Sequence, residues 1–186
     1  MTSFPSRAVH DALARAGVLR EVRGTLPDEL TGITDDSRQV GPGSLFAAVR
    51  GTARDGHDFL SAIADRAGAA IVEDASRTTL PALVVTDARR AAPIAAAVAY
   101  GEPGAKLKLV AVTGTNGKTT TVGMLRHLLD EGDAGRCASI GTLGVLVGSE
   151  GSPQPGGGGL TTPGPVELQR VLRTLVDAGV TTVAME

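Results

Sequence analysis

Aromatic residues and cysteine are scarce in this sequence, and it has neither a long apolar run nor a basic block. Only 2% of the 186 residues are aromatic, so a core must be built from Val, Leu, Ile and Ala. Such a core suits a parallel α/β sheet, whose strands are apolar on both faces. The single cysteine, Cys137, excludes a disulfide framework and a thiolate metal cluster, and we expect it to be a small buried hydrophobic residue.

Charge and hydropathy also limit the binding partners. The net charge is −2 without a basic cluster, which gives no electrostatic support for nucleic-acid binding. The N-terminus carries charges where a signal peptide needs an apolar run, and no apolar stretch reaches membrane-spanning length. The sequence therefore predicts a cytoplasmic protein that binds neither a membrane nor nucleic acid.

The stretch 107–121 carries the most specific chemical pattern. An apolar strand-like run, 109–112, ends in Thr-Gly-Thr-Asn-Gly-Lys-Thr-Thr, and a helical pattern follows. Strand, glycine loop, Lys-Thr and helix is the order of a phosphate-binding loop. The residues predicted to bind ATP are Gly114, Thr115, Asn116, Gly117, Lys118, Thr119 and Thr120.

Each part of this loop has a physical role. Gly114 and Gly117 let the backbone approach an anion, and the N–H groups at the helix start point at it. We assign Lys118 as the catalytic cation for the outer phosphates, and the Thr119 hydroxyl is placed to ligate Mg²⁺. The common loop has glycine six residues before its lysine, where this chain has Val112, so the loop is shorter. A glycine-rich turn without a ligand is the alternative interpretation.

Periodicity and breaker residues predict an α/β chain of two domains. The break at 101–104 separates a small α/β domain, 1–104, from part of a phosphate-loop domain with a mainly parallel sheet, 105–186. The predicted helices are 5–16, 57–67, 88–100 (with Pro93 near its first turn), 165–178, and one after the phosphate loop with Val122, Leu125, Leu128 and Leu129 on one face. The predicted strands are 32–35, 45–49, 69–72, 82–86, 109–112, 136–140, 145–147 and 180–185, with a loop or short strand in 18–31 and a flexible loop at 148–159.

The second domain has few strands. Apart from the short run 145–147, only about three strands follow residue 105, whereas a doubly wound sheet usually has more, with helices over both faces. We therefore expect this chain to be the front part of a longer protein, and we expect an exposed apolar strand edge at 180–185.

Several segments resemble one protein family. The Thr-Gly-Thr-Asn-Gly-Lys-Thr-Thr loop resembles the ATP loop of the UDP-N-acetylmuramoyl-peptide ligases (Mur ligases) and of their folylpolyglutamate synthetase relatives. Asp36-Ser37-Arg38 with the Val-Gly-Pro-Gly-Ser-Leu-Phe run, then 55–59, resembles the N-terminal domain of the Mur ligases that add the third peptide residue. Leu160-Thr-Thr-Pro163 and Val183-Ala-Met-Glu186 resemble two further segments of that family. The resemblance covers essentially the whole chain but only the first part of the family's chain.

This resemblance implies a binding site for the uridine diphosphate of the substrate in the first domain. Its residues would be Asp35, Ser37, Thr52, Ala53 and Arg54. A serine hydroxyl and loop N–H groups suit a diphosphate, and Arg54 can add charge. Asp-Ser as a plain turn and Pro-Gly as a hairpin remain the alternatives.

The resemblance also implies roles near the γ-phosphate of ATP. Thr161 and Thr162 would hold the muramoyl substrate, and Glu186 would help to hold Mg²⁺. Leu160 stands where the family has asparagine, which removes one amide contact. A threonine can instead cap the following helix, and Glu186 can be a solvated terminal residue.

The function that the resemblance implies is an ATP- and Mg²⁺-dependent amide-forming ligase of peptidoglycan precursor synthesis. It would add L-lysine or meso-diaminopimelate to UDP-N-acetylmuramoyl-L-alanyl-D-glutamate, as a monomer when full length. A folylpolyglutamate-synthetase-like ligase, disfavoured by the Asp-Ser-Arg segment, and a non-catalytic nucleotide-binding fragment remain as alternatives. His10, His57 and His127 have no partners at metal-ligand spacing, so we interpret them as structural or exposed.

Overall fold

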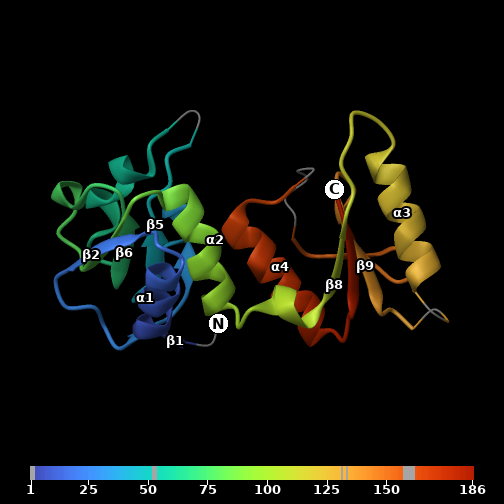
Figure 1. Ribbon diagram of the computed structural model, residues 1–186, viewed down its shortest axis with the longest axis horizontal. Helices are drawn as coiled ribbons and strands as arrows, with labels where there is room; N and C mark the ends of the chain where they lie inside the picture. The colour runs from blue at the N-terminus through green and yellow to red at the C-terminus, as the bar shows by residue number, and fades with distance from the viewer. Residues whose placement is uncertain (1–2, 52–53, 131, 133, 157–161) are drawn as a thin grey trace. The chain divides into compact units, whose positions relative to one another are not determined.

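The computed structural model describes residues 3–51, 54–130, 132, 134–156 and 162–186 (Figure 1). The chain divides into two compact units, residues 1–99 and 100–186, and each contains a five-stranded sheet. The predicted α/β class is therefore confirmed. None of the helices in the described ranges has the length and apolar character that a membrane crossing requires.

The first unit is organised around the strand order β2-β7-β6-β5-β4. Strands β4 to β7 are parallel, and β2 pairs antiparallel with β7. The strands are β2 (Leu19–Arg23), β4 (Ile33–Thr34), β5 (Leu45–Ala47), β6 (Ala69–Val72) and β7 (Ala82–Val85), and a separate pair joins β1 (Phe4–Pro5) to β3 (Glu29–Leu30). The pairing of β4 with β5 is parallel, so the Gly-Pro-Gly turn between them does not close a hairpin.

Two helices, α1 (Ser6–Arg15) and α2 (Ala88–Ala99), pack together in this unit, and α2 contacts β6. They bury small and aliphatic side chains, which fits the near absence of aromatics. Pro93, predicted near the first turn of its helix, lies inside α2 at the sixth position. Helix α2 continues through it although proline cannot donate the hydrogen bond to the preceding turn.

Residues 57–67 do not form the predicted α-helix. They form two 3-10 turns, η2 (Gly56–Phe59) and η3 (Ser61–Ile63). The buried Leu60 and Ile63 are three residues apart, and a 3-10 turn places positions i and i+3 on one face, so the apolar spacing could not separate the two structures. These turns cover the sheet face that contains Phe46.

The second unit has the strand order β11-β10-β9-β12-β8. Strand β12 is parallel to both of its neighbours, and β9, β10 and β11 form an antiparallel meander. The strands are β8 (Lys108–Ala111), β9 (Cys137–Gly141), β10 (Gly144–Val147), β11 (Ser152–Gln154) and β12 (Thr182–Met185). Strand β11 lies in the stretch predicted to be a flexible loop, because pairing with β10 overrides its poor strand propensity.

Helices α3 (Lys118–Leu129) and α4 (Pro165–Asp177) lie on opposite sides of this sheet (Figure 1). Helix α4 buries Val171, Leu172 and Leu175 against β9 and β12. In α3, Val122 is buried and Leu125 is half-buried, but Leu128 is 71% exposed and Leu129 40% exposed. The predicted apolar face of α3 is thus covered only in its first part.

The expected exposed edge at 180–185 is wrong. Strand β12 is central, paired with β8 on one side and β9 on the other, and its Val183 and Ala184 are fully buried. The edge strands of this sheet are β11 and β8, and in β8 Leu109 is 45% exposed and Val110 36% exposed. Chain order alone does not give strand order in a parallel sheet, because each crossover can place its strand on either side.

Two candidate nucleotide sites

The predicted phosphate-binding loop leaves the carboxyl end of β8 and enters α3 at Lys118. Gly114 and Gly117 have φ angles of 148° and 79°, values that residues other than glycine rarely adopt. Lys118 Nζ donates a 2.8 Å hydrogen bond to the Gly114 carbonyl, which folds the lysine over the loop. The spacing of the glycines and the lysine therefore has a direct conformational reason.

The start of α3 is a site for negative charge. The first helical hydrogen bond runs from the Thr121 N–H to the Gly117 carbonyl, at 2.9 Å. Gly117 is the N-cap and has no side chain to satisfy the N–H groups of Lys118, Thr119 and Thr120. These donors, together with the lysine ammonium, can bind a phosphate.

Glu186 lies opposite this loop. Its carboxylate accepts hydrogen bonds from the Thr142 N–H at 3.0 Å and the Thr142 hydroxyl at 3.2 Å. Strands β8, β9 and β12 are mutually parallel, so their carboxyl ends form one edge of the sheet. That edge contains a recess of about 290 Å³ lined by Thr115, Asn116, Gly117, Lys118, Thr119, Thr120, Thr142 and Glu186.

The electrostatic surroundings keep Glu186 ionised. Burial acts to raise the pKa of its carboxyl, but the hydrogen bonds from Thr142 and Thr119 and the charge of Lys118 lower that pKa below its ordinary value. A carboxylate beside a threonine hydroxyl is a fitting donor pair for Mg²⁺, which prefers oxygen ligands and completes its shell with water and phosphate oxygens. In the described part of the chain, no group of three or more His, Cys, Asp or Glu side chains could hold a metal ion.

Thr162 joins the same edge through a 3.1 Å hydrogen bond from its hydroxyl to the Glu186 carbonyl. Gly164, not a threonine, is the N-cap of α4, and as a glycine it has no side chain with which to cap the helix. The helix-capping alternative for Thr162 is therefore wrong. Thr161 and Leu160 lie outside the described residues.

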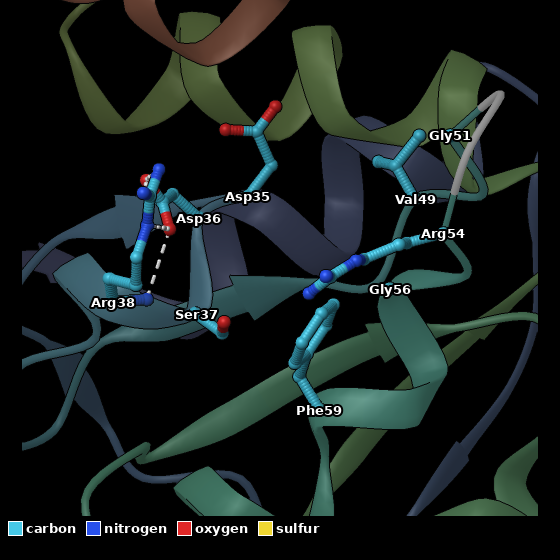
Figure 2. Close-up of a pocket in the computed structure, with 9 residues that line it drawn as sticks. All are labelled: Asp35, Asp36, Ser37, Arg38, Val49, Gly51, Arg54, Gly56 and Phe59. Atoms are coloured by element: carbon cyan, nitrogen blue, oxygen red, sulfur yellow. Dashed lines mark hydrogen bonds and ion pairs between the residues drawn. The ribbon is translucent and has the colours of Figure 1, made fainter.

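A second recess, of about 570 Å³, lies in the first unit. It is lined by Asp35, Asp36, Ser37, Arg38, Val49, Gly51, Arg54, Gly56 and Phe59. Figure 2 shows Ser37 and Phe59 at its floor and Arg54 reaching from the loop after β5 toward its centre. The structure thus brings together the predicted Asp35, Ser37 and Arg54, whereas Thr52 and Ala53 lie outside the described residues.

Asp36 fixes the conformation of this recess next to Ser37. Its carboxylate accepts the Arg38 N–H at 3.0 Å and pairs with the Arg38 guanidinium, with Nη2 at 2.7 Å (Figure 2). These bonds from Arg38 lower the pKa of Asp36 to about 2. The Asp-Ser-Arg segment is therefore a capped 3-10 turn, η1 (Ser37–Gln39), that presents Ser37 to the cavity.

Phe59 and Thr142 are among the lining residues that the sequence did not predict as site residues. Phe59 belongs to the 55–59 stretch that carries the family resemblance, but nothing in that pattern indicates that its side chain lines a recess. Thr142 was not singled out, although it follows a predicted strand at a Gly-Thr pair, where the carboxyl edge of a parallel sheet begins.

A glycine-lysine loop at the carboxyl edge of a parallel sheet, faced by a carboxylate, is typical of nucleotide-binding α/β proteins. The family model described as "Mur ligase family, catalytic domain" matches residues 29–111, and "Mur ligase middle domain" matches residues 112–186. The chain belongs to the Mur ligase family.

Curated relatives show which members of the Mur ligase family this chain is similar to. A UDP-N-acetylmuramoyl-L-alanyl-D-glutamate–2,6-diaminopimelate ligase of Geobacter metallireducens is 44% identical over 177 residues, which is 94% of this chain and 34% of that protein. The ligase of the same name from Geobacillus thermodenitrificans is 41% identical over 165 residues, 88% of this chain and 32% of that protein. The chain spans about a third of the length of these relatives.

Solved structures share the fold. A structure of a UDP-N-acetylmuramoyl-L-alanyl-D-glutamate–2,6-diaminopimelate ligase superposes with a TM-score of 0.71 at 24% identity, covering 98% of this chain and 35% of that one. A MurF structure from Acinetobacter baumannii gives a TM-score of 0.64 at 23% identity, covering 100% of this chain and 36% of that one. At these identities the likeness extends to the fold alone.

Proposed function

We propose that this chain forms the UDP-substrate-binding and phosphate-binding parts of an ATP-dependent, amide-forming ligase. The ligase adds L-lysine or meso-diaminopimelate to UDP-N-acetylmuramoyl-L-alanyl-D-glutamate in peptidoglycan precursor synthesis, in the cytoplasm and as a monomer. The observation that carries the proposal is the meeting of Lys118, Thr119 and Glu186 at one sheet edge. Support comes from relatives at 35–44% identity that are all named as ligases of this substrate.

In this proposal the second unit, 100–186, binds the ATP phosphates. The residues responsible belong to the ATP-binding domain predicted to begin at residue 105. The N–H groups at the start of α3 bind phosphate oxygens, and Lys118 leaves the Gly114 carbonyl to contact the outer phosphates. The Thr119 hydroxyl and the Glu186 carboxylate would hold Mg²⁺, and the bound ion would supply positive charge against that of the transferred phosphoryl group. Thr162 lies where the substrate carboxylate would approach that group, and the family resemblance assigns the same role to Thr161.

The first unit, 1–99, binds the UDP part of the substrate in the recess of Figure 2. It corresponds to the UDP-substrate-binding domain predicted for residues 1–104. The Ser37 hydroxyl, the backbone beside Asp35 and the Arg54 guanidinium supply donors for the diphosphate. Thr52 and Ala53 directly precede Arg54 in the sequence, and the family resemblance assigns them to the same site. The size of the recess lies within the usual range of small-molecule pockets, about 300–1,000 Å³.

Calorimetric titration of the chain with UDP and, separately, with ATP and Mg²⁺ tests the proposal. We expect Arg54→Ala to weaken UDP binding by about tenfold and to leave ATP binding unchanged, because a charge-assisted hydrogen bond contributes about 1.5–3 kcal/mol. Arg20→Ala is the matched control, since Arg20 is exposed on β2 and does not line the recess.

A competition titration separates the proposed substrate from a folate. UDP-N-acetylmuramoyl-L-alanyl-D-glutamate should displace UDP from the chain, and a pteroylglutamate should not. Displacement by the folate alone would move the assignment to a folylpolyglutamate-type ligase. Absence of UDP binding to the chain would contradict the assignment of the first unit.

A further inference from the structure

One wall of the recess in the first unit is the loop between Arg50 and Gly56, of which residues 50, 51 and 54–56 are described. An isolated antiparallel β-bridge pairs the backbones of Arg50 and Asp55, and the Gly51 N–H donates to the Arg54 carbonyl at 2.9 Å. Gly56 lies very close to Val49, which follows β5. A Cβ added to Gly56 would be 2.7 Å from the backbone N and O atoms of Val49. The two ends of the loop are therefore held close together, and Arg54 extends from the loop.

Behind this loop lies His57, whose side chain is fully buried. Its Nε2 accepts a 3.0 Å hydrogen bond from the Glu73 backbone N–H at the end of β6. An imidazole nitrogen that accepts has no proton, so the ring proton of neutral His57 is on Nδ1. Nδ1 faces the Asp55 carboxylate at 2.7 Å. The ring thus links the loop to the sheet in one tautomer.

Asp55 receives further bonds from the backbone of His57 and from Arg77. Its Oδ1 accepts the His57 N–H at 2.9 Å, and its Oδ2 pairs with the Arg77 guanidinium at 2.9 Å. The bond from the His57 N–H and the bonds from the His57 ring and Arg77 hold the pKa of Asp55 well below its usual range. Arg50, from the other end of the loop, contacts both Asp55 at 3.7 Å and Glu73 at 3.3 Å.

Glu73 extends the network to α2. Its Oε1 accepts the Ala88 N–H at the start of that helix at 2.9 Å, and Arg89 in the same helix donates to the Arg50 carbonyl at 2.8 Å. The loop is consequently tied to β6, to α2 and to the 3-10 turn that contains Arg77. None of these network side chains lines the recess itself.

We infer that His57, Asp55 and Arg77 are positioning residues for the substrate: they hold the described ends of this loop, 50–51 and 54–56, so that the Arg54 guanidinium meets a nucleoside diphosphate. This inference rests on the proposed function of the first unit. Its physical basis is that a charged loop residue selects a ligand only when its own geometry is fixed by packing and hydrogen bonds behind it. The alternative is that the network only stabilises the fold.

The test uses the whole chain with UDP as the probe, and it measures UDP affinity, the unfolding midpoint and hydrogen exchange at the Gly56 amide. His57→Ala removes both ring contacts, and His57→Asn restores a donor toward Asp55. Arg77→Gln removes the guanidinium without leaving a buried cavity. Val9→Ala, in the buried face of α1, and Arg66→Gln, on the surface of the same unit, are the controls.

We expect His57→Ala to weaken UDP binding by about tenfold or more and Arg77→Gln by several-fold, with faster exchange at Gly56, because small displacements of binding groups have large effects. His57→Asn should recover part of the affinity. Val9→Ala should lower the unfolding midpoint yet keep UDP affinity within about twofold, and Arg66→Gln should change neither.

The outcomes separate the two hypotheses. If the unmodified chain binds UDP and both His57→Ala and Arg77→Gln keep that affinity, the positioning role is overturned and the proposed function stands. Should His57→Ala fail to fold, Arg77→Gln alone decides. If the unmodified chain does not bind UDP, the assignment of the recess and this inference fall together.

Discussion

Glu186 and Thr142 are hydrogen-bonded twice, through the threonine N–H at 3.0 Å and its hydroxyl at 3.2 Å, although they are 44 residues apart in sequence. The two residues follow the parallel strands β12 and β9, and Gly141 is the last residue of β9. A Cβ on Gly141 would be 2.2 Å from the nearer Glu186 carboxylate oxygen. The orientation of the proposed Mg²⁺ ligand therefore depends on a glycine and a threonine of the neighbouring strand.

Gly141→Ala should displace the Glu186 carboxylate. We expect Mg²⁺ to increase the ATP affinity of this variant about tenfold less than it does for the unmodified chain, because the donor pair with Thr119 is broken. ATP titrations with and without Mg²⁺ give the measurement. Gly123→Ala is the matched control, because its added Cβ meets nothing within 4 Å. An unchanged Mg²⁺ effect in Gly141→Ala would rule out Glu186 as a ligand.

Lys118→Ala should lower the ATP affinity of the chain by about 10- to 100-fold, the usual loss for a charged hydrogen-bond donor. It should also abolish ATP turnover in any longer protein that contains the remaining catalytic elements. Titration with ATP and Mg²⁺ checks the first statement, and Lys106→Ala, in the exposed turn before β8, is its control. Undiminished ATP affinity in Lys118→Ala would contradict the assignment of this lysine.

Two leucines of the second unit should differ sharply in their contribution to stability. Leu175 is 1% exposed in the core under α4, and we expect Leu175→Ala to lower the free energy of unfolding by about 2–5 kcal/mol. Leu128 on α3 is 71% exposed, so Leu128→Ala should change it by no more than about 0.5 kcal/mol. The single tyrosine, Tyr100, belongs to the second unit, so its fluorescence during urea unfolding reports on that unit. Equal losses in the two variants would contradict the described packing of α3.

Acid should weaken the first unit through Asp36. Its pKa is about 2 in the folded chain because Arg38 donates to the carboxylate, against about 3.9 in an unfolded chain. A depressed folded pKa contributes stability above the unfolded value and loses it as the pH falls through the folded value. Between about pH 4 and pH 2 the unfolding midpoint should therefore fall more steeply for the unmodified chain than for Asp36→Asn. Asp65→Asn, at a side chain 81% exposed, should follow the unmodified chain.

Cys137 should report on opening of the second unit. The thiol is fully buried on β9, and burial raises its pKa, so little thiolate is present at neutral pH. We expect a disulfide reagent to modify the folded chain at least about tenfold more slowly than the urea-unfolded chain, because reaction requires local opening. Equal rates would show that β9 is accessible in the folded state.

The order of elements could be read from the sequence in most of the chain. Apolar runs such as 69–72 and 82–86 are strands because both of their faces are buried, and the loop before Lys118 follows from glycines at positions that need positive φ. Where two structures share one spacing, as for Leu60 and Ile63, the pattern could not distinguish them. Local periodicity reports burial on one side of a segment and does not report what provides that burial.

The sequence by itself determined the family, the α/β class, and the chemistry of the phosphate loop, because these depend on residues adjacent in the chain. Only the tertiary structure decided that β12 is central, that Leu128 is exposed, and that Thr142 and Gly141 orient Glu186. It also decided that His57 is buried behind the loop of Arg54. Each of these depends on which distant segments pair, and strand pairing in a parallel sheet is set by the packing of the whole unit.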